Sequence, residues 1–160
     1  MESPVRILIV DDDEITREIL HDAVDQPSVE IALSTDGMNA LDMMAKEAFE
    51  ILITDLNMPR MNGLTLLREA RQLSPQLLTI IITGHGSLES AVQALRHGTF
   101  DYIQKPFKIE EMAATTRNAV QTVKMMRERK RMLRELESVH LKLRLLEEQQ
   151  VWNEAIHSRV

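Results

Sequence analysis

Short runs of apolar, mostly β-branched residues recur along the first two thirds of the chain, with helix-like patterns between them. Such nearly unbroken runs are typical of strands buried on both faces of a parallel sheet. The runs cover residues 5–10, 29–33, 51–54, 77–82 and 100–104. Between them, apolar residues return at the three- and four-residue spacing of helices. A strand–helix unit repeated five times predicts a doubly wound α/β fold: a five-stranded parallel sheet with right-handed crossovers and helices on both faces.

Composition excludes several classes of protein. Apolar residues make up 44% of the chain, which argues against disorder, and the absence of cysteine excludes disulfides and thiolate metal sites. The first apolar run, residues 5–10, is too short for a signal peptide and leads directly into three aspartates. No run approaches the roughly 20 apolar residues needed to cross a membrane. We therefore expect a soluble, cytoplasmic protein with no membrane partner.

The chain changes character after Pro106. All five glycines and all five prolines lie at or before this residue, so no helix breaker follows it. Acidic residues outnumber basic ones up to residue 108, whereas basic residues are in slight excess beyond it. We predict a compact domain at residues 4–120, a coiled-coil helix at 121–150, and a tail or the start of an output region at 151–160.

Chemistry-bearing residues follow four of the predicted strands. Asp11–Asp13 follow the first strand, Asp55 the third, Thr83 the fourth and Lys105 the fifth. In open α/β sheets, ligands bind beyond the carboxyl ends of the strands. Carboxylates gathered there repel one another, and a divalent cation such as Mg²⁺ relieves this repulsion. With Lys105 and Thr83 to contact phosphoryl oxygens, a carboxylate at this edge could act as a nucleophile toward phosphorus.

These motifs resemble the receiver domain of two-component response regulators. The resemblance runs from about residue 5 to the start of the last helix and implies a flavodoxin-like (βα)5 fold. Each motif is weak alone, but all of them stand at the appropriate strand ends. In order, they are Asp11-Asp12-Asp13 after Ile-Val, Asp55-Leu-Asn57-Met-Pro59 followed by Gly63, Thr83-Gly84, Tyr102, and Lys105-Pro106-Phe107.

The resemblance implies a phosphorylation site with a metal ion. Asp55 would accept a phosphoryl group from a phosphohistidine on a sensor histidine kinase. Asp12 and Asp55 would ligate Mg²⁺, with Mn²⁺ as the alternative ion, together with the backbone carbonyl of Asn57, and Asp11 would act through water. The Lys105–Pro106 bond is expected to be cis. Beyond self-phosphorylation and autodephosphorylation, no enzymatic activity is implied.

The resemblance also implies a switch around this site. Lys105 would pair with the phosphoryl group, Thr83 would swing toward its oxygens, and Tyr102 would move inward behind Thr83. Asn57 and His85 would flank the path of the hydrolytic water and so tune dephosphorylation. Simpler interpretations remain open, since Tyr102 could be an ordinary core aromatic residue and His85 an ordinary loop residue.

Asp13 has two interpretations. It could be a third pocket carboxylate, or it could open the first helix, where acidic residues are favoured. The second interpretation is preferred.

A rival class is the haloacid-dehalogenase-type phosphatase, whose motif the Asp11-Asp-Asp13 segment also resembles. Asp11 would then be the nucleophile and Asp13 the acid/base. Ile15 departs from that motif, and the segment around Asp55 would be left unexplained. A degenerate receiver that works unphosphorylated is disfavoured because Asp55 and its partners are intact.

The chain from Ile109 predicts one helix to about residue 150. Arg129 and Gln150 interrupt its heptad pattern, so we predict an imperfect two-stranded coiled coil. A single helix of this length is poorly stable alone in water, and homodimerisation supplies a partner. The a and d positions of this seam are Met125, Met132, Leu136, Val139, Leu143 and Leu146.

A basic run at Arg127–Arg131, followed by Arg134, raises the question of nucleic-acid binding. Acidic residues interrupt the run and no recognition helix accompanies it, so a solvated helix face is the preferred interpretation. We expect no direct nucleic-acid binding by this segment. We expect the chain to be part of a longer regulator with a transcriptional or cyclic-nucleotide output, in which phosphorylation switches conformation and dimerisation.

Overall fold

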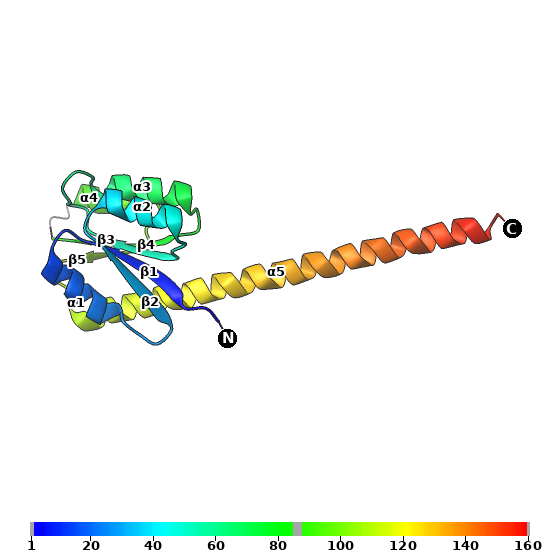
Figure 1. Ribbon diagram of the computed structural model, residues 1–160, viewed down its shortest axis with the longest axis horizontal. Helices are drawn as coiled ribbons and strands as arrows, with labels where there is room; N and C mark the ends of the chain where they lie inside the picture. Colours follow the sequence, from blue (N-terminus) through cyan, green and yellow to red (C-terminus); the bar gives the residue numbers. More distant parts are fainter. Residues whose placement is uncertain (1, 85–87, 160) are drawn as a thin grey trace. The chain divides into compact units, whose positions relative to one another are not determined.

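The computed structural model describes residues 2–84 and 88–159. Five parallel strands form one sheet in the order β2-β1-β3-β4-β5, as Figure 1 shows. The order reverses at β1, which pairs with β2 on one side and with β3 on the other. This reversal is the topological switch point at which such sheets bind ligands. The strands are β1 (Val5–Val10), β2 (Val29–Ser34), β3 (Ile51–Thr54), β4 (Leu78–Thr83) and β5 (Asp101–Gln104).

Helices cover both faces of the sheet (Figure 1). Side chains alternate along β1, so Ile7 and Ile9 pack toward one face and Leu8 and Val10 toward the other. On the first face lie α1 (Glu14–Val24) and the start of α5 (Ile109–His157); on the second lie α2 (Gly37–Lys46), α3 (Gly63–Leu73) and α4 (Leu88–Arg96). The predicted fold class is confirmed.

Three strands differ slightly from the predicted bounds. β2 continues to Ser34 and β4 to Thr83, because Ser34 pairs with Val10 and Thr83 with Gln104. The strands thus reach the carboxyl edge that carries the predicted site. At the opposite edge, β4 begins one residue later than predicted because the Leu77 N–H bonds to the Ser74 carbonyl. β5 likewise begins at Asp101 rather than at residue 100.

The last helix belongs to two compact units. Residues up to Val123 form the first unit, in which Met112, Ala119 and Val120 pack into the core under the sheet. Residues from Lys124 onward form the second unit. The helix ends at His157, beyond the predicted end near residue 150, because nothing in residues 151–157 breaks it. Among the described residues, no helix combines the length and the apolar character that crossing a membrane would require.

Candidate functional site

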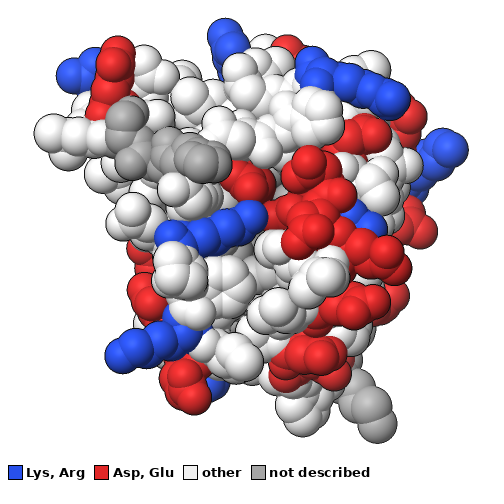
Figure 2. Space-filling model, turned by 90° about the vertical axis from the view of Figure 1, so that its left-hand side faces the viewer, with Lys and Arg blue, Asp and Glu red and all other residues white. Residues whose placement is uncertain are grey.

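The carboxyl edge of the sheet brings together residues from four strands. Asp11 follows β1, Asp55 follows β3, Thr83 ends β4 and Lys105 follows β5. Asp11, Asp55 and Thr83 are all buried, with exposed fractions of 1%, 8% and 0%. Figure 2 faces this side of the molecule and shows acidic side chains gathered beside a few basic ones. Polar groups buried away from water in this way must form hydrogen bonds with one another.

Lys105 joins the two buried carboxylates. Its Nζ donates to Asp55 Oδ2 at 2.8 Å and to Asp11 Oδ2 at 3.0 Å. The sequence separation is 50 residues in the first case and 94 in the second, so only the fold creates these contacts. The predicted cis bond between Lys105 and Pro106 is present.

Burial and pairing set the charge state of the site. Burial raises the pKa of Asp11, and the hydrogen bonds from the Asp13 N–H and from Lys105 offset this only in part. Burial alone would lower the pKa of Lys105, but its bonds to Asp55 and Asp11 outweigh burial and raise that pKa above its usual value. Lys105 is therefore a firmly protonated cation between two acids.

The three consecutive aspartates have different surroundings. Asp11 points into the site, whereas Asp12 and Asp13 are exposed. Asp13 is the N-cap of α1, since its carboxylate accepts from the Thr16 N–H at 3.0 Å. The hydrogen bonds from Thr16 hold the pKa of Asp13 below its usual value. The preferred interpretation of Asp13, a helix cap, accounts for these contacts.

Asn57 lies between the predicted acceptor and the predicted switch residue. Its N–H donates to Asp55 Oδ1 at 3.0 Å, and its side-chain Nδ2 donates to Thr83 Oγ1 at 3.3 Å. The loop that carries Asn57 is held by the Gly63 N–H, which donates to the Leu56 carbonyl at 2.8 Å. A Cβ at Gly63 would lie 2.3 Å from the Asp55 carbonyl oxygen, so only glycine fits there.

Tyr102 on β5 packs against the core on the side of α2, α3 and α4. Its hydroxyl is buried and has no hydrogen-bond partner among the described residues. Burial raises the pKa of Tyr102, and the charge of Asp55 adds to this effect. Its predicted inward movement stays a prediction. His85, the other predicted tuning residue, lies outside the described residues.

Arg17 at the rim of the site was missed by sequence reasoning. Its Nη1 donates to the Asp11 carbonyl at 2.7 Å, and the side chain is half-buried. A cation in the first turns of a helix opposes the helix dipole, and this mismatch is the signal that could have drawn attention to Arg17.

A magnesium ion suits the oxygen atoms that meet here. Mg²⁺ usually takes one or two protein carboxylates and completes its shell with water and phosphate oxygens. Asp11 and Asp55 supply such a pair, and their two charges exceed the single charge of Lys105. Within the described part of the chain, no three His, Cys, Asp or Glu side chains surround a single point. The site residues therefore fit Mg²⁺ through this pair, with Asp12 exposed beside it.

Comparison with known proteins gives a consistent result. Residues 7–117 match the family model described as response regulator receiver domain. The DNA-binding transcriptional regulator NtrC of Escherichia coli (strain K12) is 36% identical over 114 residues, which cover 71% of this chain and 24% of that protein. The response regulator MprA of Mycobacterium bovis (strain BCG / Pasteur 1173P2) is 37% identical over 120 residues, covering 75% of this chain and 52% of MprA. The chain thus spans about a quarter of the length of NtrC and about half of the length of MprA.

Solved structures agree with the sequence relatives. A CheY-like response regulator receiver domain protein from Methanospirillum hungatei JF-1 is 28% identical with a TM-score of 0.73, covering 78% of this chain and 99% of that one. NtrX from Brucella abortus is 32% identical with a TM-score of 0.72, covering 79% of this chain and 29% of NtrX. The family match covers most of the chain and includes all four strand ends that build the site. The chain therefore belongs to the response regulator receiver domain family.

Proposed function

We propose that this receiver is phosphorylated on Asp55. Family membership makes the chain a phosphoacceptor switch of two-component signalling rather than an enzyme that turns over a substrate, and it implies a cognate histidine kinase. The observation that carries the choice of Asp55 is its contact with Lys105, whose ammonium also holds Asp11. A buried carboxylate paired in this way combines a nucleophile with a cation for the incoming phosphoryl oxygens.

The reaction follows from the arrangement of these groups. A carboxylate oxygen of Asp55 attacks phosphorus as the P–N bond of a phosphohistidine breaks, and the leaving imidazole keeps the electron pair of that bond and takes up a proton. Lys105 stabilises negative charge on the phosphoryl oxygens, and the hydroxyl of Thr83 donates to one of them. Asp11, Asp12, Asp55 and the Asn57 carbonyl would hold Mg²⁺, which would supply further neutralising charge.

Asp11 as the nucleophile of a phosphatase has less support. In that alternative Asp13 would be the acid/base, but its carboxylate caps α1 through Thr16. No observation at this site favours turnover of a phosphomonoester.

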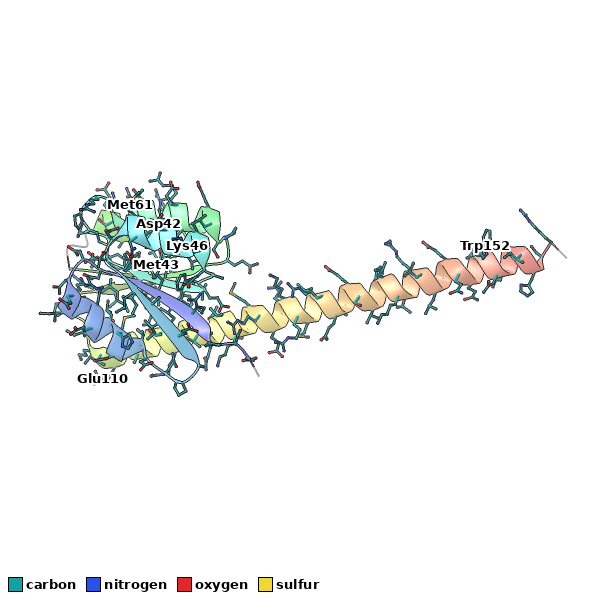
Figure 3. The ribbon with its side chains drawn as sticks, in the orientation of Figure 1. Asp42, Met43, Lys46, Met61, Glu110 and Trp152 are labelled. Carbon is teal, nitrogen blue, oxygen red and sulfur yellow. The ribbon has the colours of Figure 1, made fainter. Side chains whose placement is uncertain are left out.

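Phosphorylation of Asp55 is tested by mass spectrometry of the intact protein after incubation with acetyl phosphate and Mg²⁺. We expect one added phosphoryl group in the wild type and in the matched control Asp42→Asn, which alters an exposed aspartate on α2 (labelled in Figure 3). Asp55→Asn should abolish the addition. A phosphoryl group that persists in Asp55→Asn and disappears in Asp11→Asn would support the rival nucleophile.

A second part of the proposal concerns the helix beyond Val123. The six predicted seam residues are all exposed, with fractions from 53% to 69%, although each is large and apolar. Met125, Met132 and Leu136 line one shallow groove along the helix. An exposed apolar row with heptad spacing is what a second copy of the same helix would bury. We therefore propose homodimerisation through residues 125–146, with phosphorylation at Asp55 altering the strength of the pairing.

The output is proposed to be transcriptional. The support is similarity to NtrC, a DNA-binding transcriptional regulator of which this chain covers only 24%. An experiment that joins the chain to a reporter DNA-binding domain would test whether phosphorylation at Asp55 changes transcription.

A further inference from the structure

Asn57 holds the Thr83 hydroxyl from a fixed position. The backbone of Asn57 is anchored because its N–H donates to Asp55 Oδ1, and the next turn is closed by the bond between the Gly63 N–H and the Leu56 carbonyl. From this anchored backbone the carboxamide reaches Thr83 Oγ1 at 3.3 Å. Thr83 itself is completely buried. The reach of the Asn57 carboxamide is therefore limited by its anchored backbone.

The Asn57–Thr83 bond competes with the proposed switch. If Asp55 is phosphorylated, Thr83 must move its hydroxyl toward a phosphoryl oxygen and donate to it. The bond is 3.3 Å long, near the upper limit for a hydrogen bond, so a displacement of Thr83 away from Asn57 breaks it. A contact present in only one of two states stabilises that state.

Tyr102 provides the opposing influence. Its hydroxyl is buried without a partner among the described residues, which is an unfavourable arrangement for a polar group. The unphosphorylated arrangement therefore carries a cost at Tyr102 and a stabilising contact at Asn57. The balance between the two arrangements should respond to removal of either side chain.

We propose that the carboxamide of Asn57 is a latch that holds Thr83 in its unphosphorylated position. This inference rests on the proposed phosphorylation of Asp55 and assigns to Asn57 a role separate from the water path and from its backbone carbonyl. Asn57 is a positioning residue here, since it acts through Thr83. Loss of one neutral hydrogen bond should raise the population of the activated arrangement about 2- to 10-fold.

Tyr102 offers a direct readout, because it is the only tyrosine in the chain. Replacing it with 3-fluorotyrosine gives a single fluorine resonance. The position of this resonance in the ligand-free wild type and its position in the wild type with Mg²⁺ and beryllofluoride define the two ends of the scale. In ligand-free, metal-free protein, Asn57→Ala should move the resonance toward the beryllofluoride end. Asn57→Leu, which keeps a similar shape but has neither a donor nor an acceptor, should move it in the same direction.

Affinity supplies the second measurement. Asn57→Ala keeps the backbone contacts of Asn57 and should bind beryllofluoride about 2- to 10-fold more tightly than the wild type. Asn118→Ala, at an exposed asparagine of α5, is the matched control and should bind as the wild type does. An unchanged ligand-free resonance in both Asn57 variants, or an unchanged affinity in Asn57→Ala, would overturn the latch. Failure of the wild type to bind beryllofluoride would instead overturn the proposed function, and with it the latch that rests on it.

Discussion

Lys105 Nζ lies 2.8 Å from Asp55 Oδ2, and the same ammonium lies 3.0 Å from Asp11 Oδ2. One cation thus separates two carboxylates that belong to neighbouring strand ends. Because both acids are almost completely buried, water cannot solvate their charges in place of the ammonium. The contact therefore contributes to the fold as well as to the proposed phosphorylation site.

Lys105→Met should weaken both properties. Without the ammonium, Asp11 and Asp55 face each other without a counter-ion, and we expect a loss of about 1–3 kcal/mol in the free energy of unfolding at neutral pH in EDTA. Urea denaturation followed by circular dichroism measures this. Beryllofluoride binding should also be lost, whereas Lys108→Met, at an exposed lysine, should change neither property. Full stability in Lys105→Met would show that the ion pairs contribute nothing net.

Asp11→Asn should be more stable than the wild type at pH 7 in EDTA. Burial raises the pKa of Asp11, so the folded state binds a proton more readily than the unfolded state does. The folded state therefore gains stability relative to the unfolded state as the pH falls, and it carries a penalty above the raised pKa. The amide resembles the protonated acid and removes that penalty. The difference in melting temperature should shrink as the pH is lowered through the raised pKa, and a difference that grows in acid would contradict this account.

Gly63→Ala should be severely destabilising, whereas Gly37→Ala should be mild. At Gly63 the new Cβ would meet backbone, with the Asp55 oxygen at 2.3 Å and Leu56 Cα at 2.8 Å. At Gly37 it would meet Met61 Sδ at 2.8 Å, and a flexible methionine can move aside (Met61 is labelled in Figure 3). We expect a loss of about 2–3 kcal/mol for Gly63→Ala and below about 1 kcal/mol for Gly37→Ala in denaturant titrations.

Leu143→Glu and Leu141→Glu should distinguish pairing through the predicted coiled-coil seam from non-specific association of exposed apolar residues on α5. Both leucines lie on α5 and both are 54% exposed, but only Leu143 occupies the predicted seam. Burying a charge at the seam of both copies should weaken dimerisation about 10-fold or more, while Leu141→Glu should change it less than about 2-fold. Sedimentation of the wild type and both variants measures this. Equal effects would exclude the predicted seam, and a monomeric wild type would exclude the dimer itself.

Further exposed apolar residues lie outside the predicted seam. Trp152 is one of them and stands on the surface of α5, as Figure 3 shows. The heptad pattern of residues 125–146 gives Trp152 no seam position. No observation within the described residues assigns a partner to it.

The sequence alone determined the fold class and the edge at which the site lies. Apolar runs of strand length alternating with helical patterns allow few arrangements other than a doubly wound parallel sheet. In such a sheet all carboxyl ends lie at one edge, so residues as distant as Asp11 and Lys105 could be assigned to one site before any contact was known. Glycine and proline usage likewise indicated where the compact unit gives way to a long helix.

Only the tertiary structure decided what each side chain does at that edge. Of three consecutive aspartates, Asp11 turns inward while Asp13 caps α1, because the chain leaves β1 after Val10 and enters α1 at Glu14. The Asn57–Thr83 bond joins the loop after β3 to the last residue of β4, and no local pattern encodes the distance between them. Sequence periodicity reports which face a residue occupies within its own element, whereas a hydrogen bond between elements depends on their packed positions to within a fraction of an ångström.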